Sequence, residues 1–209
     1  MFMDTEIVKC YIIPLAMGFG LSACAGLRAW IPLLIVSLLS SFDVISLNEK
    51  MAFLSSTKFI WACGAATVLE LAGDKIPWLD HFLDAAGTVI RPAAGIVLGS
   101  AVVTNSDPTV MAIAGIIGGG TALTVCAGKA SARALVSVIP FGRTTASFLE
   151  DAASVLGSLL GILLPILGFM LCAALVWLSV KLITRCVKCG IDIRNRFRKK
   201  TEPAETEAC

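Results

Sequence analysis

The sequence predicts an all-α protein, a polytopic bundle of membrane helices with broken or re-entrant segments and an internal duplication. Three observations support this. Of 209 residues, 57% are hydrophobic and 15% are charged, with a mean hydropathy of +0.87, whereas a soluble domain carries about 25% charged residues. Long uncharged runs recur along the chain, and two short phrases each occur twice in the same order. Too little polar sequence remains to cover the apolar runs in water, so the bilayer is the expected solvent.

Three uncharged runs are of a length suited to crossing a membrane. Residues 10–27, 108–128 and 152–180 contain no Asp, Glu, Lys or Arg over 18, 21 and 29 residues, and a spanning helix needs roughly 20. Shorter apolar segments at 29–42, 59–69 and 92–105 each abut charges. We therefore expect five to seven hydrophobic segments. A buried core helix of a soluble protein would explain one such run but not all of them.

Two of these stretches are expected to break. Residues 152–180 would form a helix of about 43 Å against a hydrocarbon core of about 30 Å, and Pro165 and Gly168 near the middle predict a kink or a hairpin. Residues 10–42 are interrupted at "CAGLRAWIP". Irregular backbone at membrane depth persists only where protein or a polar cavity covers it.

The predicted organisation is one transmembrane domain followed by a tail. The domain covers residues 1–184, with one half at about 7–105 and the other at about 108–184, and residues 185–209 form a basic and then polar tail with a disordered end. Eight of the seventeen basic residues lie between positions 181 and 200. Because basic flanks stay on the cytoplasmic side, the C-terminus is expected there. Anionic lipid is the partner that such a flank attracts. Nucleic acid is not expected as a partner, because the sequence has no folded basic module of the kind that binds it.

The doubled phrases suggest two related halves. "SACAGLRA" (22–29) parallels "TVCAGKASARA" (124–134), and "FLDAAGTVI" (82–90) parallels "FLEDAASVL" (148–156). Each half thus has a basic phrase and then an acidic one. Duplicated halves are common in membrane transporters, with the polar site at their interface. An extra segment in the first half, about 43–74, would let the two halves take opposite topology.

Acids and bases gather around these phrases and form a candidate polar site. A charge at membrane depth is costly and usually pairs or lines a wet cavity. We therefore expect Asp84 and Asp151 each to approach a basic residue of this set. The alternative is that the charges are helix caps and structural ion pairs. The candidate residues are Arg28, Glu70, Asp74, Asp80, Asp84, Arg91, Lys129, Arg133, Glu150 and Asp151.

Evidence for an enzyme is weaker. Asp80 and Asp84 are four residues apart and would share a helix face, so with Asp74 they could hold a divalent cation bridging phosphates. The Asp-Gly-x-x-Ala-Arg head of a membrane CDP-alcohol transferase is missing, however, and no Ser-His-Asp, H-E-x-x-H or P-loop string occurs. His81, the single histidine, reads as a helix-surface residue, with a proton relay as the alternative. We expect no cofactor and favour a non-enzymatic role.

Four phrases carry a resemblance to a known family. "AGLRAWIPL", "ELAGDKIPWLDHFLDAAGTVIRPAAG", "GKASARA" and "LED" together resemble the bacterial family known as domain of unknown function 4126. The resemblance covers nearly all of residues 15–170, and its acidic stretch is the most specific part. It implies a small integral membrane protein, expected in a bacterial inner membrane. It implies no substrate, and the basic tail after Lys181 lies outside it.

Three functional hypotheses follow. The leading one is a small transporter or channel-like permeation protein with a buried charged site. The second is a non-transport membrane scaffold with structural ion pairs. The third is a lipid-phosphate-handling protein, a scramblase or an enzyme, that uses Asp74, Asp80 and Asp84 with a cation. Charges converging on a cavity would favour the first, closed pairs without a cavity the second, and carboxylates open at the headgroup level the third.

Overall fold

The computed structural model describes residues 11–73, 77–104, 108–136 and 142–201, with the backbone alone for 77–81, 134–136, 142–146 and 189–201. Every regular element in these ranges is helical, which confirms the all-α class. In chain order the elements are α2 (Ile13–Leu27), α3 (Trp30–Ser41), the 3-10 helix η2 (Glu49–Ser55), α4 (Thr57–Gly73), α5 (Pro77–Ala101), α6 (Pro108–Val136), α7 (Gly142–Leu163) and α8 (Pro165–Thr201).

Proline sets several helix starts. Pro77, Pro108 and Pro165 are the first residues of α5, α6 and α8. Proline suits this position because the first helical N–H has no intrahelical acceptor and the ring already holds a helical φ. Between α7 and α8 only Leu164 separates the helices, and Gly168 lies so close to Gly161 that an added Cβ would meet the Gly161 backbone. The predicted break at Pro165 is therefore confirmed, and of the two predicted forms, a kink or a hairpin, it is the hairpin.

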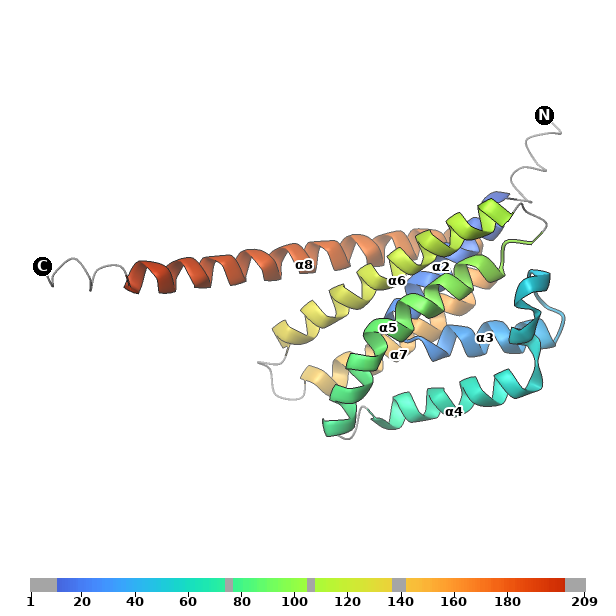
Figure 1. The fold of residues 1–209 in the computed structure, drawn as a ribbon, viewed down its shortest axis with the longest axis horizontal. Helices are drawn as coiled ribbons and strands as arrows, with labels where there is room; N and C mark the ends of the chain where they lie inside the picture. Colours follow the sequence, from blue (N-terminus) through green and yellow to red (C-terminus); the bar gives the residue numbers. More distant parts are fainter. Residues whose placement is uncertain (1–10, 74–76, 105–107, 137–141, 202–209) are drawn as a thin grey trace, which may run out of the picture.

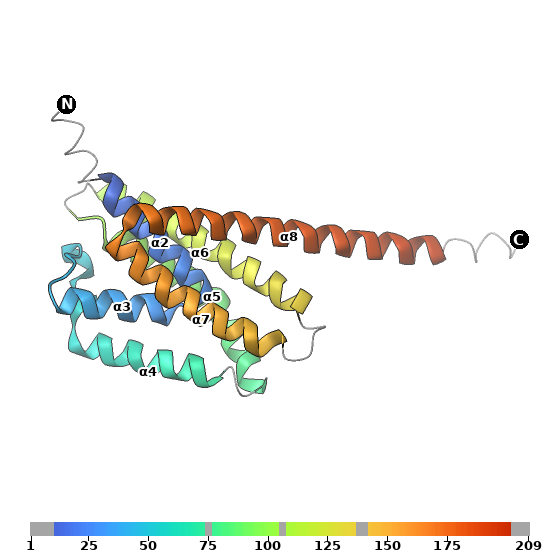
Figure 2. The ribbon, with the colours of Figure 1, turned by 180° about the vertical axis from the view of Figure 1, so that it is seen from behind.

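Helix α2 lies at the centre of the bundle (Figures 1 and 2). It packs antiparallel to α5, where the Ser22 hydroxyl donates to the Gly95 carbonyl at 2.9 Å, and parallel to α8, where the Cys172 thiol lies 3.1 Å from the Gly20 carbonyl. Helices α5 and α6 form an antiparallel pair beside it. Two faces of one central helix thus bring the first and second parts of the chain together.

The break predicted in residues 10–42 falls at Arg28. Helix α2 ends at Leu27, and Arg28 is extended, with φ −139° and ψ 119°. Helix α3 then returns alongside the bundle, and its far end is tied to η2 by a 2.7 Å hydrogen bond between the hydroxyls of Ser40 and Ser55. The reversal leaves the Arg28 side chain within the protein, where it is 1% exposed.

Close packing of α2, α5 and α6 depends on small residues, which we call the glycine seam. An added Cβ on Gly118 would meet the Gly95 carbonyl and lie 2.6 Å from Ser22 Oγ, and one on Gly26 would lie 2.6 Å from the Ala122 carbonyl. Without side chains at these points the helix backbones approach one another directly. The seam consists of Gly18, Ser22 and Gly26 of α2, Gly95 and Gly99 of α5, and Ala114, Gly118 and Ala122 of α6.

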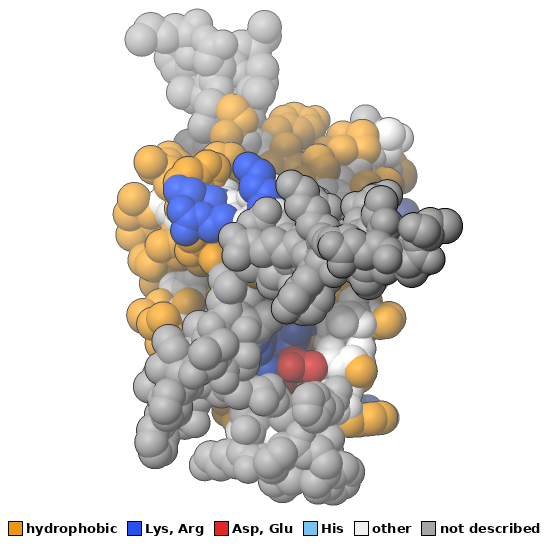
Figure 3. Space-filling model, turned by 90° about the vertical axis from the view of Figure 1, so that its left-hand side faces the viewer, with side chains coloured by type: hydrophobic (Ala, Val, Ile, Leu, Met, Phe, Trp, Pro, Cys, Tyr) orange, Lys and Arg blue, Asp and Glu red, His pale blue; other side chains and the backbone are white. Residues whose placement is uncertain are grey.

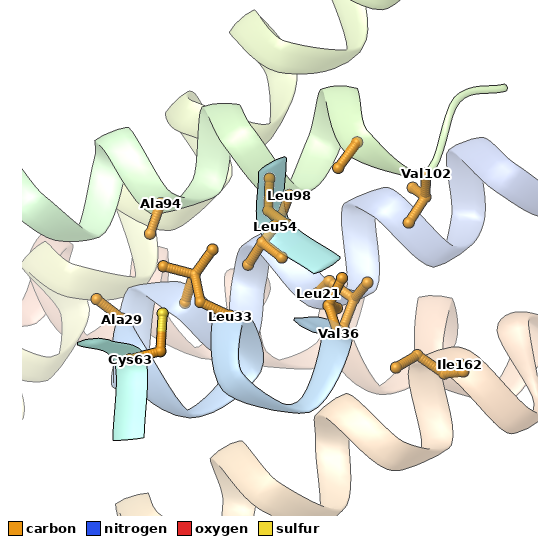
Figure 4. Packing of buried hydrophobic residues seen from close by; sticks show 12 residues of the cluster. Leu21, Ala29, Leu33, Val36, Leu54, Cys63, Ala94, Leu98, Val102 and Ile162 are labelled. Carbon is orange, nitrogen blue, oxygen red and sulfur yellow. The ribbon is translucent and has the colours of Figure 1, made fainter. Parts of the chain in front are cut away.

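Larger apolar side chains fill the space between this seam and the outer helices. Leu33 and Val36 of α3 pack in one cluster with Leu98 of α5, Leu54 of η2 and Ile162 of α7 (Figure 4). The remaining outward surface is also apolar, because Trp61, Ile116 and Ile166 are each at least 70% exposed. Apolar surface on both sides of a helix is expected when the solvent is lipid.

In the part of the chain that the structure describes, three helices are long and apolar enough to cross a membrane: Phe82–Ala101, Pro108–Arg133 and Pro165–Lys188. The bent pair Glu49–Ser55 and Thr57–Gly73, which meets at 61°, brings the number to as many as four. Helices α2 and α3 are apolar but have only 15 and 12 residues. Helix α8 has 37 residues and continues through position 184 to Thr201 without a break, so it projects beyond the other helices (Figure 1).

The expected opposite topology of the two halves is wrong. Helices α2 and α6, which carry the two basic phrases, run parallel, since Ser22 faces Gly118 and Gly26 faces Ala122. Helices α5 and α7, which carry the acidic phrases, both run antiparallel to α2. The physical reason is a matter of parity. Two return segments, α3 and α4, lie between the basic and acidic phrases of the first half, although only α4 falls in the extra segment of about 43–74, so the original direction is restored.

Candidate functional site

One end of the bundle collects the charges, and we call it the charged end. Here α2 and α4 end, α5 and α7 begin, and α8 leaves the bundle. Figure 3 looks onto this end and shows basic side chains with an acidic one beside them, while hydrophobic side chains flank the sides. Eight residues are linked into what we call the charge network: Arg28, Glu70, Asp84, Arg91, Lys129, Arg133, Glu150 and Asp151.

Arg28 joins three parts of the chain. Its Nε lies 2.7 Å from Asp151 Oδ1 on α7, and its Nη2 donates to Ser147 Oγ at 2.9 Å. Its Nη1 faces Glu70 of α4, 3.4 Å from the main-chain oxygen and 4.0 Å from Oε1. Because Arg28 follows the last turn of α2, these contacts fix where α4 and α7 meet the central helix.

Arg91 of α5 holds the next two acids. Its Nη2 lies 3.4 Å from Asp84 Oδ1 and 3.8 Å from Glu70 Oε1, while Nη1 lies 3.5 Å from Cys126 Sγ of α6. Asp84 and Arg91 are seven residues apart, about 10 Å along a helix. The arginine therefore extends the network roughly two turns deeper into the bundle.

Glu150 connects α7 to α6. Its Oε2 lies 2.8 Å from Lys129 Nζ and 3.2 Å from Arg133 Nη2, and Arg133 Nη1 lies 2.8 Å from Asp84 Oδ2. Lys129 also donates to the Leu27 carbonyl at 3.0 Å. That carbonyl belongs to the last turn of α2, where a cation is favoured by the helix dipole. Among the described residues α6 and α7 touch at few other points, so this carboxylate is the main described link between their side chains.

Acids and bases alternate through the network. Its order is Asp151, Arg28, Glu70, Arg91, Asp84, Arg133, Glu150, Lys129. Each neighbour in this order has the opposite charge, and the four acids balance the four bases. Removing so many charges from water is expensive, and only complete pairing with additional hydrogen bonds offsets that cost. The network is accordingly closed by pairing in the described state.

The doubled phrases exchange partners. Asp84 of the first acidic phrase pairs with Arg133 of the second basic phrase, and Asp151 of the second acidic phrase pairs with Arg28 of the first. Both acids thus lie beside a basic residue of the candidate set, as the sequence predicts. Sequence reasoning missed Ser147, which binds Arg28, and Cys126, which contacts Arg91.

For two of the candidate site residues, Asp74 and Asp80, the structure does not describe the side chain. Asp74 lies outside the described residues, and Asp80 is on the first turn of α5 with its side chain also outside them. Within the described part of the chain, no group of three or more His, Cys, Asp or Glu side chains could hold a metal ion. The candidate carboxylates whose side chains are described each face a basic residue instead: Glu70, Asp84, Glu150 and Asp151.

A cavity lies at the opposite end of the bundle, which we call the cavity end. Its volume is about 490 Å³ and every residue lining it is apolar. It opens between α2, α5, α6 and the start of α8. The lining residues are Ile12, Leu15, Ala16, Phe19, Gly99, Ala114, Ile117, Gly118, Ile166 and Phe169. The cavity reaches the glycine seam, which contributes Gly99, Ala114 and Gly118 to its lining, and Ser22 and Gly26 lie along α2 between the cavity and the charge network.

The long apolar helices, the exposed apolar surface and the buried charge network define the class of protein, a helical membrane protein. The chain belongs to the family described as Domain of unknown function (DUF4126), whose model matches residues 15–185. The match therefore reaches past residue 170 and includes Arg185, the first basic residue after Lys181. Neither a curated protein nor a solved structure matches the chain.

Proposed function

We propose that this protein is a small permeation protein, a transporter or channel-like pathway, whose charged end is shut by the charge network. The observation that carries the proposal is the pattern of the pairs. Apart from Asp84 with Arg91, each described ion pair joins different segments of the chain. Breaking such pairs separates helices, which is what opening one end of a bundle requires.

The cost of the network supports a functional role. A buried ion pair can often be replaced by apolar residues at no loss of stability, so stability alone does not call for eight linked charges. Ionisable groups within membrane segments usually mark a permeation or binding pathway. The apolar cavity opens at the opposite end of α2. An entrance at one end and a closure at the other are the arrangement expected of one state of an alternating pathway.

A membrane scaffold is the second candidate. One observation favours it: the network is charge-balanced and closed, and the described cavity is lined by apolar residues that do not belong to it. In that case the ion pairs would only fix the helix positions.

We also propose an orientation and an origin. Trp177 is exposed on α8, and Lys181 Nζ lies 4.6 Å from its ring centre. Exposed Trp followed by basic residues is typical of a membrane interface on the cytoplasmic side. The charged end and the C-terminus would then face the cytoplasm, with anionic lipid near the basic part of α8. The bacterial inner membrane is the expected location, and the exchanged ion pairs support an internal duplication.

Glu150→Gln tests the proposal, because Glu150 holds both Lys129 and Arg133. The purified variant, with its fold checked by gel filtration and circular dichroism, is reconstituted in liposomes. Passive flux of K⁺, Cl⁻, H⁺ and a small neutral solute is compared with wild type. At least one flux should rise about tenfold, which corresponds to destabilising the closed state relative to the open state by about 1.4 kcal/mol.

Glu49→Gln is the matched control, since Glu49 lies exposed on η2 away from the network and should leave every flux unchanged. If folded Glu150→Gln and wild-type protein conduct none of these solutes above empty liposomes, the permeation proposal fails and the scaffold is retained.

A further inference from the structure

We propose that Arg91 and Arg133 form an oxyanion-binding site that is occupied, in the described state, by the chain's own Asp84 carboxylate. The ligand class is an oxyanion with two or more free oxygens, such as a phosphate group. This inference deepens the proposed function and rests on it, because it names the substrate class of the same site.

The geometry is that of an anion held between two guanidinium groups. Arg133 Nη1 lies 2.8 Å from Asp84 Oδ2, and Arg91 Nη2 lies 3.4 Å from Asp84 Oδ1. Each carboxylate oxygen therefore faces a different arginine, and the two arginines come from α6 and α5. Planar guanidinium groups offer paired N–H donors that match the oxygen spacing of carboxylates and phosphates.

Both arginines are held in place independently of Asp84. Arg133 Nη2 donates to Glu150 Oε2 at 3.2 Å, and Arg91 Nη1 lies 3.5 Å from Cys126 Sγ. Gly87 also makes room for Arg91, since an added Cβ there would lie 2.9 Å from the guanidinium carbon. Removing the Asp84 carboxylate would thus leave two oriented guanidinium groups facing one space, with Glu70 still beside Arg91 and Glu150 still beside Arg133.

Asp84 is the acid of the network most able to leave. Its side chain is 37% exposed, whereas those of Glu70 and Glu150 are 10% and 13% exposed. An incoming anion could take its position while the Asp84 side chain rotates toward solvent. Phosphate can arrive free in solution or as a lipid headgroup. The second source is available because the part of α8 that carries the Trp177 and Lys181 pair packs on α6 where Gly128, next to Lys129, lies against Ser179.

Asp84→Asn vacates the proposed site without removing either arginine. Thermal unfolding of the variant is followed in a maltoside detergent, with millimolar inorganic phosphate added at constant ionic strength. Phosphate at about ten times its Kd should raise the Tm by about 3 °C, and wild type should respond by less than a third of that. Glu49→Gln should behave as wild type. A parallel series replaces free phosphate by phosphatidic acid in mixed micelles, and the stronger response identifies the source.

Arg133→Lys in the Asp84→Asn background tests the guanidinium. It keeps the charge but loses the paired donors, so the phosphate response should fall at least threefold. Asp84→Ser serves as the vacating variant if Asp84→Asn does not fold. The site is overturned if neither phosphate source raises the Tm of a vacated variant, or if Arg133→Lys leaves the rise unchanged. Phosphate binding with silent flux in Glu150→Gln liposomes would retain the site and refute permeation, whereas flux without binding would refute the site alone.

Discussion

The two ends of the bundle hold the same helices together by opposite means. At the charged end, long side chains reach across gaps between α2, α4, α5, α6 and α7 and meet as ion pairs. Toward the cavity end, the helices touch through positions that have almost no side chain. Ion pairs between flexible side chains can be broken and made again with small backbone changes. A contact between helix backbones at glycine has no such freedom, because the helices already touch there and any added atom would collide.

Helix α2 shows both means within a few residues. Gly18, Ser22 and Gly26 repeat every four residues and let α5 and α6 approach, since positions four apart lie on one helix face. Two residues later, Arg28 carries the most buried charge of the network. We infer that the seam acts as the fixed part of the bundle and the charged end as the adjustable part.

The largest expected effect is at Arg28. Arg28→Gln removes the cation that lies 2.7 Å from Asp151 and one of the two cations beside Glu70. Removing one partner of a buried pair costs about 3–5 kcal/mol. The unfolding midpoint in detergent should fall accordingly. Lys58→Gln, at an exposed position, is the control and should change it by less than about 0.5 kcal/mol.

The double variant Arg28→Gln/Asp151→Asn sharpens this result. It removes the paired acid together with the base, so part of the loss should be recovered. A double variant as unstable as the sum of its single changes would mean that the 2.7 Å pair contributes no coupling.

The next effect is in the glycine seam. Gly118→Ala places a Cβ against the Gly95 carbonyl and Ser22 Oγ, and overpacking of this kind costs about 1–3 kcal/mol. Gly120→Ala on the same helix meets nothing within 4 Å and should be neutral or stabilising by up to about 1 kcal/mol. Equal effects of the two substitutions would contradict the distinction between seam and surface.

A smaller effect is expected outside the network but at the same end. Lys181→Gln removes the cation over Trp177, and an exposed contact of this type contributes about 0.5–1 kcal/mol. Thermal unfolding should therefore change far less than in Arg28→Gln. A loss as large as that of Arg28 would show that burial does not distinguish the two cations.

Substitutions that only report the orientation in the membrane should have the smallest effect, with no change in stability. A cysteine introduced at Ser46, exposed before η2, should react with a membrane-impermeant thiol reagent on intact cells. The native Cys189 in the basic part of α8 should be protected until the cells are opened. The reverse pattern would exchange the sides assigned to the two ends.

Much of the helical fold and part of the charged end could be predicted from the sequence. The charge-free runs predict helices, Arg28 and Pro165 predict the two breaks, and the pairing of Asp84 and Asp151 with basic residues follows from the cost of an unpaired charge in a membrane. These features depend on strong local signals or on large energies.

Other features could not be predicted, because they depend on distances between helices. Ser147 and Cys126 resemble the many small residues of apolar helices, and nothing in their neighbourhood indicates that an arginine lies beside them. The predicted direction of the two halves is wrong because the sequence places the extra segment at about 43–74 only, whereas the 12-residue α3 before it is a return segment as well. Short helices bury too little sequence to leave a clear pattern.

The unbroken course of α8 has a mechanical consequence. Its 37 residues give a rod of about 55 Å, so about 25 Å extends past a hydrocarbon core of about 30 Å. Within the bundle, α8 packs on α6 where Gly128 lies against Ser179 and, further out, where Cys186 Sγ lies 3.6 Å from the Ser131 carbonyl oxygen. A sideways force on the outer arm would therefore be delivered as torque on α6, the helix that supplies Lys129 and Arg133.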